Sequence, residues 1–210
     1  MNQKISPFEL KTQRYEKWFE DNIYAYRSEL KAIKSLISDF KRGVEIGIGS
    51  GRFSEPFGID VGVDPSSNML KIAKRKGIEV IKGVSEHLPF KENSFDLALV
   101  VTTICFFEDA ERSLKEINKI LEKKGCLIIG FVDKDSHLGR VYQKKKEDNI
   151  FYKKAEFYST DEVKSLLKRI GFNDIKIVQT LFDKLDNLDH IDDVREGFGE
   201  GGFIAVKAKI

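Results

Sequence analysis

The feature that most constrains the fold of this chain is a short apolar segment that runs into three closely spaced glycines. Val44–Ile48 has the apolar character of a strand, and it passes into a loop containing Gly47, Gly49 and Gly51. Such a loop lets backbone N–H groups approach a ligand closely, and a helix that begins after it presents its positive dipole end to an anion. The segment therefore predicts a strand, a ligand-binding turn and a helix, which is the first unit of an α/β fold.

Apolar strand-like segments and helical patterns alternate from this point to residue 132. The expected strands are Val44–Ile48, Ile59–Val63, Ile78–Ile81, Phe95–Thr103 and Cys126–Val132. The expected helices run over Ser67–Lys76, with Gly77 after it, and from Asp109 to a stop at Gly125. This alternation predicts a parallel sheet that helices cover on both faces, with the carboxyl ends of its strands at one ligand-binding edge.

The two ends of the chain predict additions to this sheet. Aromatic and aliphatic residues recur at helical spacing over Thr12–Ile37, which indicates an N-terminal helical cap. Ser159 and Glu162 form a capping box before a helix, and the strands Ile175–Leu181 and Phe203–Ala208 then predict an antiparallel finish. The expected fold class is α/β, a doubly wound, mostly parallel seven-stranded sheet with an antiparallel last strand.

Composition excludes several classes of protein. The 210 residues are 41% hydrophobic and 33% charged, which excludes extended disorder. The 36 basic and 34 acidic side chains give a net charge of +2, and the basic residues form no concentrated stripe along the sequence. We therefore expect no nucleic-acid partner. The apolar runs are too short to span a membrane, and Met1–Leu10 lacks the apolar core of a signal peptide. Cys105 and Cys126 are expected to be reduced residues of a cytoplasmic protein.

A carboxylate at the end of the second expected strand points to a nucleoside ligand. Asp64 is placed to accept both hydroxyls of a ribose. The glycine spacing disfavours a dinucleotide, because the position of the third glycine of that fingerprint holds the bulky Arg52. The loop also lacks the Gly-Lys-Ser/Thr sequence of an ATP-binding P-loop. The pattern read from Glu45 is instead acid-x-Gly-x-Gly-x-Gly.

These residues resemble the class I S-adenosylmethionine-dependent methyltransferases, specifically the methyltransferase type 11 group. The resemblance covers Thr12–Ile129 well and the C-terminal third loosely. The motifs that carry it are Glu45–Gly51, Gly62–Ser66 with Met69 and Leu70, Gly83–Phe90 with Asn93–Asp96, and Leu114–Gly125. Their specificity comes from their order, because one glycine motif alone would be a weak signal.

The resemblance implies a Rossmann-like methyltransferase fold, S-adenosylmethionine as cofactor and methyl transfer by in-line displacement. One domain is expected over residues 1–210, with a helical cap at 1–40, a cofactor-binding half at 41–132 and a substrate-side half at 133–210. The implied cofactor-binding residues are Tyr15, Trp18, Glu45, Gly47, Gly49, Ser50, Asp64, Pro65, Met69, Ser85, Glu86 and Thr102. The glycines and Ser50 would wrap the methionine part of the cofactor, with Glu45 near its ammonium group.

The remaining implied roles concern the nucleoside and the sulfonium. Asp64 would hold the ribose hydroxyls, and Ser85 and Glu86 would address the adenine edge, with Met69 beside the ring. Tyr15, Trp18 and Thr102 would close over the methionine and the sulfonium, where an aromatic face is favourable for a cation. Tyr15 and Trp18 also suit the core-facing stripe of an amphipathic helix, and the sequence leaves that alternative open.

Three departures from the family pattern concern the catalytic machinery and the crossover. Val84 stands where the family usually has an acid that contacts the adenine amino group. Cys105 and Phe106 replace a histidine pair often found after the fourth strand, so no catalytic residue is assigned. The crossover between the glycine loop and Asp64 is short and contains Pro56, which predicts a first helix of one or two turns. No metal-ligand spacing occurs.

We expect a small-molecule methyl acceptor and a monomer or weak homodimer that binds no membrane. Substrate-side residues are expected in the N-terminal helices and in Asp133–Tyr158. One alternative is a non-catalytic regulatory protein that binds S-adenosylmethionine, which the missing acid and histidine pair would suit. Another is an RNA or protein methyltransferase, indicated by Lys144–Lys146, and a dehydrogenase remains a further alternative.

Overall fold

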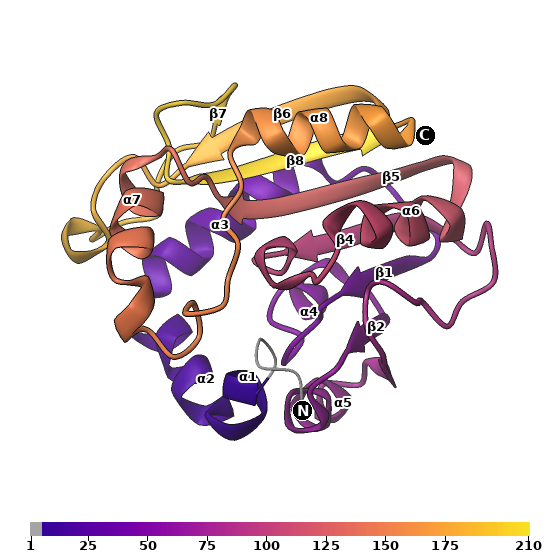
Figure 1. The fold of residues 1–210 in the computed structure, drawn as a ribbon, viewed down its shortest axis with the longest axis horizontal. Coiled ribbons are helices and arrows are strands. Elements are labelled where there is room, and N and C mark those ends of the chain that lie inside the picture. Colours follow the sequence, from indigo (N-terminus) through magenta and orange to yellow (C-terminus); the bar gives the residue numbers. More distant parts are fainter. Residues whose placement is uncertain (1–5) are drawn as a thin grey trace.

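The computed structural model describes residues 6–210, which form an eight-stranded mixed sheet with helices on both faces (Figure 1). The strands are β1 (Gly43–Ile46), β2 (Val61–Asp64), β3 (Glu79–Lys82), β4 (Phe95–Val101), β5 (Leu121–Val132), β6 (Asn173–Thr180), β7 (Arg195–Glu196) and β8 (Phe203–Lys209). The α-helices are α1 (Ser6–Leu10), α2 (Thr12–Asp21), α3 (Ile23–Leu36), α4 (Ser54–Phe57), α5 (Ser67–Arg75), α6 (Ala110–Ile120), α7 (His137–Lys144) and α8 (Thr160–Ile170). Short 3-10 helices are η1 (Ile104–Phe106), η2 (Lys146–Asp148) and η3 (Leu185–Asn187). The expectation for Met1–Leu10 lies partly outside the described residues.

The strand order across the sheet is β3-β2-β1-β4-β5-β8-β6-β7. The first five of these strands are parallel, and β8 runs antiparallel to both β5 and β6. The doubly wound sheet with an antiparallel last strand is therefore confirmed, and the two-residue strand β7 adds an eighth strand to the seven expected. The parallel strands end at the left of Figure 1, where α1, α2 and α7 lie.

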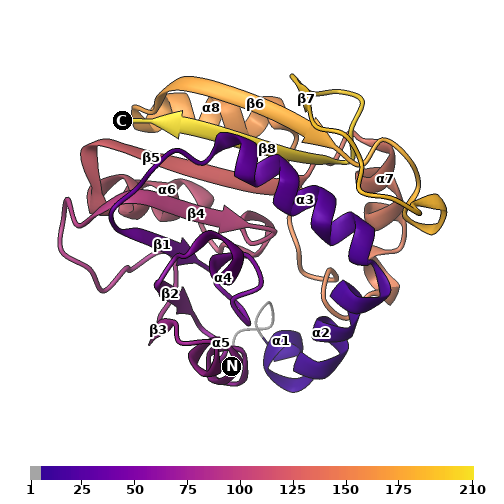
Figure 2. The ribbon, with the colours of Figure 1, turned by 180° about the vertical axis from the view of Figure 1, so that it is seen from behind.

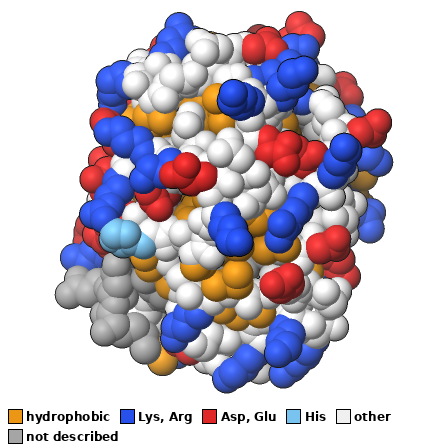
Figure 3. Space-filling model, turned by 90° about the vertical axis from the view of Figure 1, so that its right-hand side faces the viewer, with side chains coloured by type: hydrophobic (Ala, Val, Ile, Leu, Met, Phe, Trp, Pro, Cys, Tyr) orange, Lys and Arg blue, Asp and Glu red, His pale blue; other side chains and the backbone are white. Residues whose placement is uncertain are grey.

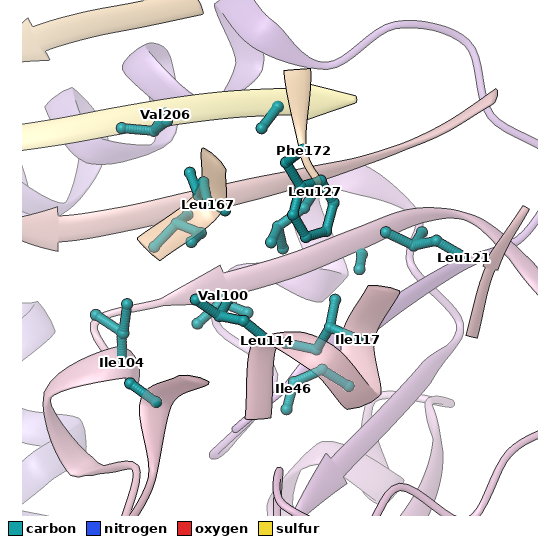
Figure 4. Close-up of a cluster of buried hydrophobic side chains, with 14 of the residues drawn as sticks. Ile46, Val100, Ile104, Leu114, Ile117, Leu121, Leu127, Leu167, Phe172 and Val206 are labelled. Atoms are coloured by element: carbon teal, nitrogen blue, oxygen red, sulfur yellow. The ribbon is translucent and has the colours of Figure 1, made fainter. Parts of the chain in front are cut away.

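Helices from different parts of the chain bury the two faces of the sheet. Figures 1 and 2 show α6 and α8 on one face, with α3 and α4 on the other. Figure 4 shows Leu114 and Ile117 of α6 and Leu167 of α8 directed at the sheet, where Val100 is fully buried. On the other face, Ile33 of α3 is fully buried in a second apolar cluster. Each such side chain contributes about 1.5–3 kcal/mol when it is removed from water.

The crossover from β1 to β2 is as short as the sequence predicts. Helix α4 contains four residues, one of them Pro56, and it ends at Gly58 with φ 68°. The strand β1 and the loop that follows it are consequently brought close to Asp64 by a single helical turn rather than by a long helix.

Helix α6 ends earlier than the expected stop at Gly125. Leu121 is already paired with Phe95, and Leu97 pairs with Cys126, so the intervening residues form an irregularity within β5. Leu121 is 1% exposed. Burial of this side chain draws the chain into the strand directly after Ile120, so that the glycine lies within β5.

The capping box before α8 forms as expected. The Glu162 N–H donates to Ser159 Oγ, and the Ser159 N–H donates to the Glu162 carboxylate at 2.8 Å. Gly171 ends the helix in the left-handed region, with φ 101°. These local signals place α8, and they fix where the chain enters β6.

The surface carries mixed charges. Figure 3 shows the side of the molecule at the right of Figure 1, where Lys and Arg side chains are interspersed with Asp and Glu. This mixture agrees with the near balance of acidic and basic residues in the chain. Within residues 6–210, no helix combines the length and the apolar character that crossing a membrane requires.

Candidate functional site

The glycine loop after β1 adopts backbone conformations that favour glycine. The φ angles are 75° at Gly47, 54° at Gly49 and 76° at Gly51. A Cβ atom on Gly47 would lie 2.1 Å from the Thr103 side chain, whereas a Cβ atom on Gly49 would have no heavy atom within 4 Å. Packing against the end of β4 therefore requires a glycine at position 47, while Gly49 faces open space from which a ligand can approach the backbone.

Asp64 lies beside this loop at the end of β2. Its Oδ2 accepts a hydrogen bond from the Gly49 N–H at 2.9 Å, and its Oδ1 accepts one from the Ser66 N–H at 2.8 Å. Burial raises the pKa of Asp64 to about 6, although these two N–H donors oppose the rise. The carboxylate is therefore ionised at neutral pH, and its oxygens have lone pairs left to accept hydroxyl donors.

A cavity of about 70 Å³, here called the loop cavity, opens next to Asp64. It is lined by Phe8, Tyr15, Gly47, Gly49, Asp64, Pro65, Met69, Thr102, Thr103 and Phe106. Most of the residues that the sequence assigned to the cofactor thus meet at one place. Thr102 lies at the tip of β4 with φ 50°, an uncommon conformation for a residue with a side chain.

A second cavity of about 70 Å³, here called the side cavity, adjoins the loop cavity. It is lined by Ile46, Gly47, Val63, Pro65, Gly83, Val84, Ser85, Glu86, Thr103, Phe106, Phe107 and Glu108. Gly47 and Thr103 line both cavities. Ser85 is buried at the wall, and the Glu86 carboxylate accepts a hydrogen bond from the Glu108 N–H at 2.8 Å. The Glu86 side chain is therefore already engaged in holding the loop before α6.

Glu45 and Ser50 line neither of these cavities. Glu45 is 1% exposed, and its carboxylate accepts a hydrogen bond from Ser54 Oγ. Burial raises the pKa of Glu45 to about 8, against the opposing effect of this hydrogen bond. Ser50 is equally buried, and its hydroxyl has no hydrogen-bond partner among the described residues. Neither side chain therefore borders the loop cavity or the side cavity.

A larger cavity of about 180 Å³, here called the aromatic cavity, adjoins the loop cavity. It is lined by Phe8, Arg14, Tyr15, Trp18, Phe19, Glu29, Thr102, Phe106, Val132, Tyr142, Asn149, Phe151 and Tyr152. Tyr15 and Thr102 line both this cavity and the loop cavity, whereas Trp18 lines only the aromatic one. The segments predicted to form the substrate side, the N-terminal helices and Asp133–Tyr158, supply most of its wall.

Phe8 and Glu29 are among the residues of this cavity that the sequence does not single out. The Phe8 ring lies 5.4 Å from Tyr15 and 4.9 Å from Phe106, measured between ring centroids. It comes from α1, a five-residue helix that is too short to show helical periodicity. Glu29 belongs to the amphipathic pattern of α3, and its only signal is a charge at a position where the helix is buried.

Comparisons with known proteins identify the family to which this chain belongs. Residues 44–129 match the family model described as a methyltransferase domain. A protein from Thermotoga maritima, whose crystal structure is described as that of a SAM-dependent methyltransferase and possible histamine N-methyltransferase, is 49% identical in sequence to this chain. Its TM-score is 0.96, and the alignment covers 98% of this chain and 99% of that one. The chain belongs to the S-adenosylmethionine-dependent methyltransferases.

Two further comparisons concern the sequence and the fold. An uncharacterized protein of Methanocaldococcus jannaschii is 45% identical to this methyltransferase over 98% of the chain and 99% of its own length. A Haemonchus contortus phosphoethanolamine N-methyltransferase, solved with phosphomonomethylethanolamine and S-adenosylhomocysteine, shares the fold at a TM-score of 0.63 and 18% identity, covering 86% of this chain and 52% of that one. The predicted family, fold class and enzyme class are confirmed, and the cofactor is S-adenosylmethionine.

The residues of the loop cavity fit this cofactor chemically. Open space above the Gly49 backbone, a buried carboxylate at Asp64 and the apolar wall at Met69 suit an amino acid, a ribose and an adenine ring respectively. Val84 supplies no acid to the side cavity, whose lining includes Glu86 and Glu108. Among residues 6–210, no group of His, Cys, Asp and Glu side chains is placed to hold a metal ion.

Proposed function

We propose that this methyltransferase transfers the methyl group of S-adenosylmethionine, bound across the loop and side cavities, to a small molecule in the aromatic cavity. One observation carries the proposal: Tyr15 and Thr102 line both the loop cavity and the aromatic cavity. A methyl group held at this shared wall can be approached from the aromatic side in line with the bond that breaks. The division into a helical cap, a cofactor-binding half and a substrate-side half is part of this proposal.

The residue roles toward the cofactor follow from the contacts described above. Asp64 accepts the ribose hydroxyls, and the backbone at Gly49 approaches the methionine part. Met69 packs beside the adenine, and Ser85 contributes backbone at its edge. Glu45 acts through the loop, because its carboxylate holds Ser54 and does not line the cavity.

The cofactor supplies an activated methyl group on a sulfonium, and the chain supplies orientation and a dry surrounding. Holding two reactants in line contributes on the order of 7–11 kcal/mol to lowering a barrier. The rings of Tyr15 and Phe106 at the shared wall present aromatic surface to the positive charge, which contributes about 0.5–2 kcal/mol. These contributions need no histidine, which accommodates Cys105 and Phe106 in place of the histidine pair.

The dimensions of the aromatic cavity support a small acceptor over a macromolecule. A space of about 180 Å³ that is walled by aromatic side chains accommodates a metabolite-sized group. The Lys144–Lys146 run, which would favour RNA, lies at the end of α7 and in η2, and its residues do not line this cavity.

Titration with S-adenosylhomocysteine tests the cofactor site. We expect wild-type binding by calorimetry, and we expect Asp64→Asn to weaken it about 10- to 100-fold, because hydrogen bonds to a charged group contribute about 1.5–3 kcal/mol. Asp60→Asn, at an exposed aspartate just before β2, is the matched control and should bind as wild type does. Equal affinities for the Asp64 and Asp60 variants would contradict the assigned role of Asp64.

A further inference from the structure

Glu29 is a buried carboxylate of the aromatic cavity to which the proposed function gives no role. It lies on α3, it is 3% exposed, and it is among the residues that line the cavity. Its Oε2 atom has no hydrogen-bond partner among the described residues. The adjacent buried Ser28, by contrast, donates to Tyr24 O at 2.7 Å and accepts from the Asp192 N–H at 2.8 Å. Among the four buried side-chain oxygens without a partner in the described residues, only the Glu29 atom belongs to a residue that lines the aromatic cavity.

An isolated carboxylate in such a place is missing a partner. No salt bridge forms between Glu29 and any described Lys or Arg, and burial alone raises the pKa of Glu29 to about 8. Buried charges in proteins are normally paired or hydrogen-bonded, since their desolvation is otherwise uncompensated. A ligand that carries a positive charge and N–H donors would supply both the missing charge and the missing hydrogen bonds.

The walls around Glu29 suit a cation that carries an apolar body. The Tyr142 and Tyr152 rings stack with centroids 5.0 Å apart, and Trp18 packs edge-on against Phe19 at 5.2 Å. Burial raises the pKa values of Tyr142 and Tyr152, so both rings are neutral at physiological pH. Neutral aromatic faces attract an ammonium group and also accept an apolar chain or ring.

Arg14 restricts the number of positive charges on the ligand. It is exposed, and it lines the same cavity. A second ammonium group placed near this guanidinium would be repelled, whereas Arg14 forms no salt bridge with Glu29, which leaves the Glu29 carboxylate to pair with a single ammonium group. The cavity therefore suits a monoamine better than a polyamine.

Building on the proposed function, we propose that the methyl acceptor is a small monoamine. It binds as its ammonium ion between Glu29 and the aromatic rings, and Glu29 accepts the proton that must leave the nitrogen before methylation. The Thermotoga maritima relative is described as a possible histamine N-methyltransferase, but that description concerns the relative and assigns no residue to amine recognition.

The step balances in atoms and charge. The ammonium group gives one proton to the Glu29 carboxylate, which becomes a neutral carboxylic acid, and the amine nitrogen gains a free lone pair. That lone pair forms the new N–C bond while the S–C bond breaks, and the bonding electrons remain on sulfur as a neutral thioether. The product is an N-methylammonium ion, and Glu29 releases its proton to water when the product leaves.

Glu29→Gln separates the charge from the shape of the side chain. We expect wild type to form S-adenosylhomocysteine with 2-phenylethylamine or another member of a panel of small monoamines, and not with 2-phenylethanol. The variant should lose at least 100-fold in kcat/KM for the amine, with S-adenosylhomocysteine affinity unchanged. Glu20→Gln, at an exposed position on α2, is the matched control and should retain wild-type kinetics.

The pH profile distinguishes this role from a structural one. The titratable groups that face Glu29 are Arg14, Tyr15, Tyr26, Tyr142 and Tyr152. None of the four tyrosines ionises near neutrality, since burial raises their pKa values. Wild-type kcat/KM for the amine should therefore rise with pH through about 8, as Glu29 becomes ionised. The Glu29→Gln variant should lack this rising limb, and Glu29→Asp should keep it with reduced activity.

The outcomes separate this inference from the proposed function. If wild type binds no S-adenosylhomocysteine, the proposed function fails. The amine proposal alone is overturned if wild type binds S-adenosylhomocysteine but methylates only neutral alcohols or thiols. It is also overturned if no amine of the panel reacts and none binds the S-adenosylhomocysteine complex by calorimetry. Unaltered amine kinetics in a folded Glu29→Gln variant would likewise overturn it.

Discussion

Gly49 and Gly58 form a matched pair that separates backbone strain from ligand contact. Both have positive φ angles, 54° and 68°, and a Cβ atom on either would meet no heavy atom within 4 Å. Gly49 borders the loop cavity, whereas Gly58 ends α4 and does not line it. The same substitution should therefore have the same cost in stability at both positions but different consequences for binding.

We expect Gly49→Ala and Gly58→Ala each to lower the free energy of unfolding by about 1 kcal/mol, because alanine is strained at positive φ. Only Gly49→Ala should weaken S-adenosylhomocysteine binding, by at least about 10-fold, since its methyl group occupies the open space beside the backbone. Urea unfolding and calorimetric titration of the two variants provide the measurements. Equal binding by both variants would show that no ligand approaches Gly49.

Individual residues differ in how well the sequence predicts them. Gly49 and Asp64 could be predicted because a glycine loop and a strand-end acid are local patterns whose spacing is fixed by a short crossover. Glu29 could not be predicted, because its role is inferred from a carboxylate oxygen that lacks a hydrogen-bond partner. Only the packing of α3 against distant segments determines whether such a partner is present. The resemblance implies a cofactor role for Trp18 and leaves a core-facing role open, and in the structure Trp18 lines the aromatic cavity and not the loop cavity. Helical spacing alone does not specify which neighbour a side chain faces.

At the scale of elements, α1 is fastened to the start of α5. The Glu9 carboxylate accepts hydrogen bonds from Ser66 Oγ at 2.6 Å and from the Asn68 N–H at 3.0 Å. The Asn68 side chain in turn donates to the Glu9 carbonyl at 2.9 Å. These contacts hold Phe8, the next residue toward the N-terminus, where it lines both the loop cavity and the aromatic cavity.

We predict that Glu9→Ala raises the dissociation rate of S-adenosylhomocysteine about 3- to 10-fold, because two hydrogen bonds to the carboxylate are lost and each contributes about 0.5–1.5 kcal/mol. These hydrogen bonds to Asn68 and Ser66 lower the pKa of Glu9, so they persist at neutral pH and weaken only as the pH falls below the ordinary value of 4.5. Stopped-flow displacement measures the rate, and Glu20→Ala is the control. A rate equal to that of the control would mean that α1 does not retain the ligand.

Helices and strands can be predicted where one continuous segment of the sequence contains the whole pattern that specifies them. The parallel strands and α8 follow from apolar runs and a capping box that a single segment contains. The short elements were not predictable, because α1 contains five residues and β7 contains two, and each forms by pairing with a distant segment. The end of α6 was misplaced because burial of Leu121 competes with the glycine signal at Gly125.

At the scale of the whole molecule, two buried carboxylates influence how stability depends on pH. Burial raises the pKa values of Glu29 and Glu45 to about 8, from an ordinary value of 4.5. Between these pH values the folded chain binds more protons than the unfolded chain does. The free energy of unfolding should therefore fall as the pH rises from 4.5 to about 8, and this contribution changes no further outside that interval.

Asp64 adds to this fall, because burial raises its pKa to about 6, but its contribution is common to wild type and any variant at position 29. Glu9 and Glu162 have lowered pKa values through their hydrogen bonds, so their contributions to stability are lost below pH 4.5 and not above it. The hydrogen bond to Asp189 raises the pKa of His190, so its contribution is lost as the pH rises, but both side chains are exposed. The effect of His190 is common to wild type and any variant at position 29, and a comparison between them cancels it.

We predict that Glu29→Gln makes the fall in stability between pH 5 and pH 8.5 shallower. Removal of this titrating group should reduce the fall by about 1–4 kcal/mol, since one pKa unit corresponds to about 1.4 kcal/mol and partial hydration of the cavity reduces the full shift. Calorimetric melting across this range measures the slope, at about 2–4 °C in Tm for each kcal/mol. The absolute Tm of the variant at pH 5 does not decide the matter, because a glutamine amide in the same place also lacks a partner. Parallel Tm profiles for wild type and the variant would instead mean that the Glu29 carboxylate is already ionised in the folded protein at pH 5, and that water enters the cavity to solvate it.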